Sequence, residues 1–220
     1  NCCNPFNYKD YSKKGLSRLF RRRTEIFMGE WSENHISIVI EEYKKKVSID
    51  DYWCNQEDAV SNDFWKGVNN APLPMVRGIG YNCDYLGFVS VDENKIGCLI
   101  HPRVIGNELR ESPTCNSFYC AHSSLEKCEN FKEKVLDNPD FEDIVSDWYS
   151  YSLIAPYLGG LFAVEFGAKL TQELVSLVDA MIVHPSRLYP IQHRGGFLSN
   201  EKFLEKASPD LIEVIGARWS

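Results

Sequence analysis

In the first third of the chain, apolar residues recur at the spacing of amphipathic helices. Residues 10–31 predict one such helix, whose apolar positions are Leu16, Leu19, Phe20 and Ile26. Gly15 weakens the start of this helix, because glycine loses more backbone freedom on folding than other residues. Residues 32–47 predict a second helix with Ser32 as its N-cap, and residues 48–68 predict short helices rich in aromatic side chains.

The pattern changes from helices to strands after a loop rich in proline and glycine at residues 69–80. Residues 85–91 and 95–100 alternate apolar and polar positions on either side of the turn sequence DENK, which predicts a small β-hairpin. The run that follows is irregular and contains Pro102, Gly106 and Pro113.

Helical spacing returns from residue 123 and continues almost to the end of the chain. The expected helices span 123–136, 138–158, 159–170, 171–184, 199–207 and 208–219. Their expected N-caps are Asn138 or Asp140, Thr171, Ser199 and Ser208. The loop between the fourth and fifth of these helices ends with Gly195 and Gly196.

Charge and hydropathy exclude two classes of partner. The chain of 220 residues has a formal net charge of −7, whereas proteins that bind nucleic acid present a basic surface. The one dense basic run, residues 18–23, lies opposite an apolar stripe and is interpreted as a solvated helix face. The most apolar window, residues 153–166, is shorter than the ~20 residues of a spanning helix, and no signal peptide is recognisable. We therefore expect a cytoplasmic protein that binds neither nucleic acid nor membranes.

Half of the eight cysteines lie in residues 81–120, where they are Cys83, Cys98, Cys115 and Cys120. A disulfide framework is one explanation, but disulfide-dense chains are usually short and this chain is long enough for a core of its own. A second explanation is that some cysteines act as small buried hydrophobes, which suits Cys54 and Cys128.

A metal centre is the third explanation and the one that the loop-like contexts favour. Thiolates are soft ligands for Zn²⁺ or an iron–sulfur cluster, and a metal supplies folding energy where a loop has little core. The chain has no C-x₂-C pair, which structural zinc modules commonly use. Cys115 and Cys120 make a C-x₄-C step of the kind found in plant-type ferredoxins, so an iron–sulfur cluster is favoured over zinc.

The order of these motifs, "CDYLGF", "GCLIHP" and "TCNSFYC", resembles the YkgJ-like family of zinc- or iron-chelating cysteine-cluster proteins. In that family an earlier cysteine run ends in a CC pair, which "NCC" matches with Cys2 and Cys3. The resemblance implies metal or cluster binding by six cysteines, namely Cys2, Cys3, Cys83, Cys98, Cys115 and Cys120. It implies little about a reaction. The chain departs from the family in the long separation of the two blocks and in its helical C-terminal half. The earlier cysteines of the first run are not in this sequence, and whether cysteines upstream of Asn1 complete the site is left open.

Two groups of residues outside the cysteines were also considered as sites. His101 and His122 follow Cys98 and Cys120 closely, but we expect cysteine alone to hold the metal. The loop from His184 to Arg194 brings Arg187 and His193 into one segment that could bind an anion, although cationic residues are common at a helix C-terminus. No nucleophile or phosphate-loop motif is present, so no catalytic residue is predicted.

These observations predict a mainly α fold in which a single domain, residues 1–220, wraps a loop-rich cysteine metal site with a small β-hairpin. The cysteine-rich insert spans residues 81–122. The predicted function is binding of a metal or an iron–sulfur cluster. Two alternatives stay open: an enzyme that acts on a small substrate at the centre or at the His184–Arg194 loop, and a disulfide-stabilised extracytoplasmic binding protein.

Overall fold

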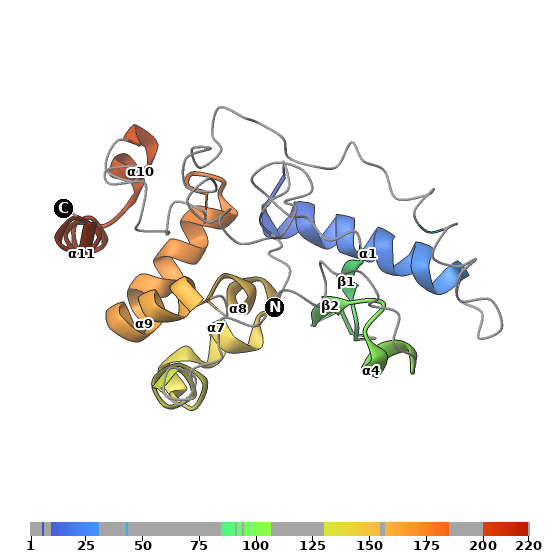
Figure 1. Ribbon diagram of the computed structural model, residues 1–220. Coiled ribbons are helices and arrows are strands. Elements are labelled where there is room, and N and C mark those ends of the chain that lie inside the picture. Colours follow the sequence, from blue (N-terminus) through green and yellow to red (C-terminus); the bar gives the residue numbers. More distant parts are fainter. Residues whose placement is uncertain are drawn as a thin grey trace, which may run out of the picture. The chain divides into compact units, whose positions relative to one another are not determined.

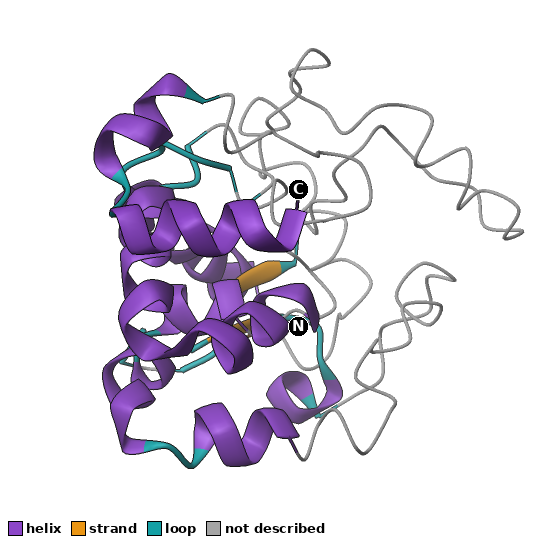
Figure 2. Ribbon diagram, turned by 90° about the vertical axis from the view of Figure 1, so that its left-hand side faces the viewer, coloured by secondary structure: helices purple, strands orange, loops and turns teal. Residues whose placement is uncertain are grey.

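Helices form most of the described part of the chain, together with one two-stranded antiparallel sheet (Figures 1 and 2). This confirms the coarse prediction of a mainly α protein with a small β-hairpin. The computed structural model describes residues 6, 10–30, 43, 85–90, 92–93, 95–106, 130–154, 157–184 and 200–219.

The chain divides into two compact units. The first comprises Asn1–Trp53 and Asn82–Cys120, and the second comprises Cys54–Tyr81 and Ala121–Ser220. Each unit has its own buried core, so each is described by itself. The single domain over residues 1–220 stays a prediction.

The first unit begins with helix α1, Lys13–Glu30, close to the predicted bounds. Ser12 is its N-cap, because the Ser12 hydroxyl accepts a hydrogen bond from the Gly15 amide at 3.1 Å. The Asp10 carboxylate in turn accepts from the Ser12 amide at 3.2 Å and from the Ser12 hydroxyl at 2.6 Å. A Cβ at position 15 would collide with the Asp10 carboxylate. Gly15 therefore has a role that helix propensity alone does not reveal, which is to leave room for this cap.

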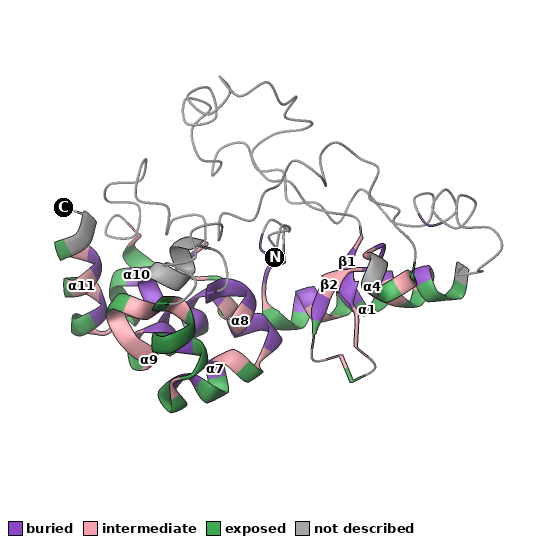
Figure 3. Ribbon diagram, turned by 60° about the horizontal axis from the view of Figure 1, so that its bottom comes forward, coloured by how far each residue is buried: buried purple, intermediate pink, exposed green. Residues whose placement is uncertain are grey.

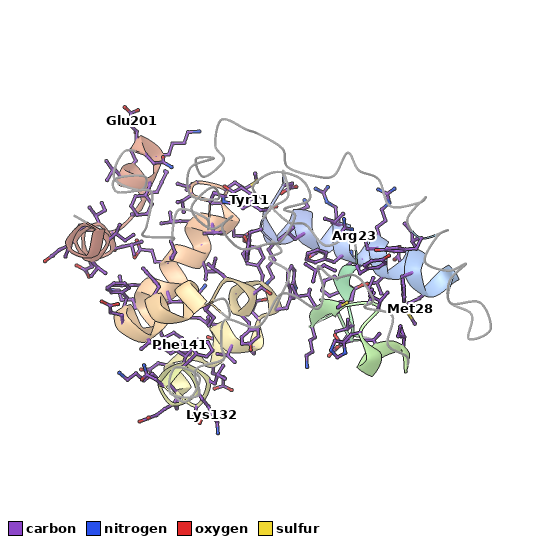
Figure 4. All side chains as sticks on the ribbon, viewed as in Figure 1. Tyr11, Arg23, Met28, Lys132, Phe141 and Glu201 are labelled. Carbon is purple, nitrogen blue, oxygen red and sulfur yellow. The ribbon has the colours of Figure 1, made fainter. Side chains whose placement is uncertain are left out.

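Buried and exposed residues follow opposite sides of α1, as its sequence predicts (Figure 3). Leu16, Phe20 and Phe27 are fully buried. The basic run only partly agrees with its interpretation as a solvated face. Three of its arginines are exposed, but Arg23, which Figure 4 labels, is only 1% exposed. The interpretation was wrong for Arg23, because this residue falls three positions after Phe20 and four before Phe27, on the buried side.

The predicted hairpin is confirmed and consists of β1, Leu86–Phe88, and β2, Ile96–Cys98. The two strands are antiparallel, and Leu86 pairs with Cys98, Gly87 with Gly97 and Phe88 with Ile96. Two backbone hydrogen bonds extend the pairing beyond the strands: Val89 donates to the Lys95 carbonyl at 2.9 Å, and Leu99 donates to the Tyr85 carbonyl at 2.8 Å.

Helix α1 packs against β1, and the side chain of Thr24 forms hydrogen bonds between them. The Phe88 amide donates to the Thr24 hydroxyl at 2.8 Å, and this hydroxyl donates to the Phe88 carbonyl at 3.1 Å. Thr24 thus satisfies both backbone groups of Phe88. The Phe20 and Phe88 rings meet edge to face beside it, with centroids 6.2 Å apart.

The described elements of the second unit are helical. They are η2 (a π-helical turn), Lys132–Leu136; η3 (a 3₁₀ turn), Pro139–Phe141; α7, Glu142–Ser146; α8, Trp148–Ile154; α9, Tyr157–Asp179; α10, Glu201–Lys206; and α11, Pro209–Trp219. The core of this unit contains Val135, Phe141, Ile144, Ile154 and Ala163.

The helix expected over residues 138–158 is in fact interrupted. Asn138 is an N-cap as predicted, and its side chain accepts from the Asp140 amide at 3.0 Å. Asp147 has an extended conformation, with φ −84° and ψ 118°, and this separates α7 from α8. Its carboxylate accepts from the Ser150 amide at 3.0 Å and from the Ser150 hydroxyl at 2.7 Å, so Asp147 caps α8. A local hydrogen bond of this kind competes with continuation of the helix.

Helix α9 joins two of the expected helices but breaks at Gly167, where φ is 76° and ψ is 176°. Glycine adopts this conformation readily, whereas other residues are strained in it. The prediction that Thr171 is an N-cap was wrong. Its hydroxyl donates to the Gly167 carbonyl at 2.7 Å, which is a bond to the preceding turn and not a cap.

The last two helices begin with side-chain caps. The Asn200 side chain accepts from the Phe203 amide at 3.2 Å, so the cap of α10 lies one residue after the predicted Ser199, which is outside the described residues. Ser208 caps α11 as predicted, with its hydroxyl accepting from the Leu211 amide at 3.2 Å. The Glu173 carboxylate of α9 accepts from the Ser208 amide and hydroxyl at 2.6 and 2.8 Å, which ties α11 to α9.

Several predictions concern parts of the chain that are not described. The helix expected over 48–68, the one over 32–47 apart from Tyr43, and the first half of the one over 123–136 lie outside the described residues. Among the helices that are described, none combines the length and the apolar character needed to cross a bilayer.

Candidate functional site

A tight turn follows β2 in the described part of the cysteine-rich insert. The His101 amide donates to the Cys98 carbonyl at 3.0 Å, which closes a β-turn over Cys98-Leu99-Ile100-His101. A turn of this kind holds its first and fourth Cα atoms less than about 7 Å apart. The backbone therefore brings a thiol and an imidazole, two of the side chains that bind transition metals, onto one short segment.

The two middle residues fix this turn to the core of the first unit. Leu99 is 1% exposed and Ile100 is 3% exposed, and both belong to a buried cluster with Phe27 and Tyr43. The rings of Phe27 and Tyr43 meet edge to face, with centroids 5.4 Å apart. The two ends of the turn, Cys98 and His101, are only half-buried, and Cys98 also packs in part against this cluster.

The C-terminal side of the turn is also held in place. Helix α4, Pro102–Ile105, starts directly after His101. The His101 carbonyl accepts hydrogen bonds from the amides of Val104 and Ile105, at 2.7 and 3.2 Å. Pro102 restricts the backbone of the residue before it to extended conformations. The backbone of His101 is thus fixed by the turn on one side and by α4 on the other.

The opposite end of the hairpin carries an ion pair with α1. Arg21 donates to Glu93 through Nε at 2.8 Å and through Nη2 at 2.6 Å. These charged hydrogen bonds hold the pKa of Glu93 below its ordinary value and raise the pKa of Arg21. Both side chains are exposed, so this pair orients the turn in water and does not form a buried charged site.

The structure describes one of the six predicted cysteine ligands, Cys98. The other five are outside the described residues, as are Cys54, Cys128 and His122. Within the described residues, no three His, Cys, Asp or Glu side chains gather closely enough to hold a metal ion. The prediction that six cysteines share a centre therefore stays a prediction.

The rival site at residues 184–194 is described only at its first residue. His184 is half-buried and follows the turn that ends α9. Arg187, His193 and Arg194 lie outside the described residues, so the anion site that they predict stays a prediction.

The anchoring of the turn is the feature that the sequence did not reveal. Leu99 and Ile100 directly follow Cys98, and the pattern predicted them only as part of a strand. Two adjacent apolar residues on an alternating strand would point to opposite faces, so two that are both buried indicate a turn. The sequence shows only two adjacent apolar residues near the proline that begins α4, and their burial is seen in the structure.

No protein-family model, curated protein or solved structure matches this chain. The resemblance to the YkgJ-like family therefore stays a prediction.

Proposed function

We propose that this protein binds a metal ion or an iron–sulfur cluster through cysteine thiolates, with Cys2, Cys3, Cys83, Cys98, Cys115 and Cys120 as the candidate ligands. The spacing of these cysteines in the sequence and the family resemblance are the basis of the proposal. Thiolate ligation suits a reducing compartment such as the cytoplasm. No reaction is assigned to the centre.

The observation that carries the proposal is the placement of Cys98. A cysteine without a special role usually packs in the core as a small hydrophobe. Here Leu99 and Ile100 fill the core, whereas Cys98 packs against their cluster only in part and stays half-buried at the end of a hairpin that is anchored on both sides. A rigid support of this kind is what a metal ligand needs, because ligand geometry must be held within narrow limits.

The test is elemental analysis of the full chain purified without oxygen, with iron, zinc and acid-labile sulfide measured per chain. We expect stoichiometric metal in the unmodified protein and a marked loss in Cys98→Ser. The matched control is Cys128→Ser, which we expect to keep its metal because Cys128 is interpreted as a core thiol. A brown protein with sulfide indicates a cluster, and a colourless one with zinc indicates a mononuclear site.

Absence of stoichiometric iron and zinc in the unmodified protein would overturn the proposal. A thiol count under denaturing conditions then identifies the rival. If fewer than the eight thiols of the sequence react, disulfides use the cysteines instead. Full metal content in Cys98→Ser would remove Cys98 from the ligand set.

A further inference from the structure

We infer that His101 binds the same metal ion as Cys98, so that the turn Cys98-Leu99-Ile100-His101 acts as a two-ligand chelating element. This inference rests on the proposed function and deepens it by naming a nitrogen ligand and the class of metal. It revises the expectation that cysteine alone holds the centre.

The spacing and the geometry of this turn agree. Structural zinc sites commonly use pairs of ligands separated by two residues, and the chain has no such pair of cysteines. Cys98 and His101 are separated by two residues, and the hydrogen bond from the His101 amide to the Cys98 carbonyl holds these residues at the two ends of one turn. The sequence therefore does contain a two-residue ligand step, in which histidine takes the second place.

Burial differs between the middle and the ends of the turn. The middle residues are almost fully buried, and the end residues are half-buried. A turn that served packing alone could carry residues without metal-binding side chains at its half-buried ends, although Cys98 also packs in part against the cluster. Here both ends are residue types that bind metals, and the buried middle removes the freedom that would otherwise be lost when an ion is bound.

A ligand set that includes imidazole favours a particular metal. Thiolates with one or two imidazoles are typical of structural Zn²⁺, whereas ordinary iron–sulfur clusters use thiolates throughout. We therefore assign the turn to a divalent ion of the Zn²⁺ class, in place of the cluster that the C-x₄-C step favoured. The remaining ligands come from the other cysteines of the proposed function.

The experiment uses the full chain, stripped of metal and titrated with Co²⁺, whose visible absorption reports the number of sulfur ligands. Three variants are compared with the unmodified protein: His101→Ala, His101→Cys and His184→Ala. The last is a matched control that removes an imidazole from the second unit. We expect His101→Ala to weaken Co²⁺ binding at least about tenfold, since even loss of a residue that only supports a ligand has an effect of this size.

The variant His101→Cys tests ligation itself, because a residue with only a structural role would not change the absorption spectrum of bound Co²⁺. We expect His101→Cys to recover tight binding with absorption shifted to longer wavelength, because a thiolate replaces a nitrogen ligand. His184→Ala should match the unmodified protein. Recovery in His101→Cys supports ligation even if His101→Ala folds poorly.

Each remaining outcome counts against the inference. Co²⁺ binding with the same affinity and spectrum in all three variants overturns it but leaves the proposed function standing. An iron–sulfur cluster of full occupancy in both His101 variants also overturns the inference and leaves the proposed function standing. If the unmodified protein binds neither Co²⁺ nor Zn²⁺ and holds no iron, the proposed function fails and the inference fails with it.

Discussion

The contact between Thr24 and Phe88 allows a direct test of how the first unit is held together. Thr24→Val replaces the hydroxyl by a methyl group of similar size. It removes the hydrogen bonds of 2.8 and 3.1 Å and leaves the Phe88 amide and carbonyl without this partner. The Phe88 residue is buried, whereas Thr24 is half-exposed, so water can replace part of what is lost.

The expected loss of stability follows from these contacts. A buried polar group that loses its partner costs about 1–3 kcal/mol. Two groups lose their partner, the amide and the carbonyl of Phe88. Because water reaches Thr24 and can replace part of what is lost, we expect the whole substitution to cost about 1–3 kcal/mol and not twice that amount. For local opening, this corresponds to a roughly 5- to 150-fold change in the equilibrium constant.

The assay is amide hydrogen exchange at residues 86–98, together with urea unfolding of the full chain. Thr24→Ser is the matched control, because it keeps the hydroxyl and loses only a methyl group, which is worth about 0.8 kcal/mol. We expect the Phe88 amide to lose protection in Thr24→Val and to keep most of it in Thr24→Ser. Equal protection of Phe88 in Thr24→Val and in the unmodified protein would refute the role of this hydroxyl.

Two further predictions concern the backbone of α9 and the charges at the hairpin. Gly167→Ala should destabilise the protein by about 1–3 kcal/mol in urea unfolding, because φ of 76° with ψ of 176° strains a residue with a side chain. The control is Gly29→Ala in α1, where an added Cβ would lie in open space, and it should be neutral or stabilising. An equal response of the two variants would contradict this account. The stabilising contribution of Glu93 should be present above its unfolded pKa and lost as pH falls through its lower folded pKa, because Arg21 favours the carboxylate. A carboxyl titration by NMR should show the pKa of Glu93 rising in Arg21→Gln, and an unchanged pKa would rule out this ion pair in solution.

Local patterns predicted the elements whose causes are local. The hairpin followed from alternation on either side of DENK, and α1 followed from apolar residues at helical spacing. Asn138 and Ser208 were correctly predicted as caps because each needs only a polar side chain just before a helix. In these cases the hydrogen bonds that define the structure lie within a few residues of each other.

The features that were missed depend on competition or on distant partners. Asp147 and Gly167 interrupt segments whose apolar spacing continues through them, so the pattern favoured unbroken helices. Arg23 is buried against the general preference of its residue type. Thr24 bonds to Phe88, which is 64 residues away, and no local signal identifies such a partner.

The candidate site was predictable only in its residue types. The sequence singled out Cys98 as a ligand and considered His101, but it did not show that Leu99 and Ile100 are both buried. Their burial depends on Phe27 and Tyr43, which come from other parts of the chain. The orientation of the turn is therefore a tertiary property, whereas its C-x-x-H spacing can be read from the sequence alone.

The hydroxyl of Thr24 also has a consequence for the order in which the chain folds. Because its partner Phe88 is 64 residues away, α1 and the hairpin can meet only after a long loop has closed. The contacts among η2, η3, α7, α8 and α9 join elements that follow one another in the sequence. Contacts between near neighbours form faster than distant ones, so these helices of the second unit can assemble early. We therefore expect the first unit to reach its native state more slowly, with the backbone groups of Phe88 open to other partners until it does.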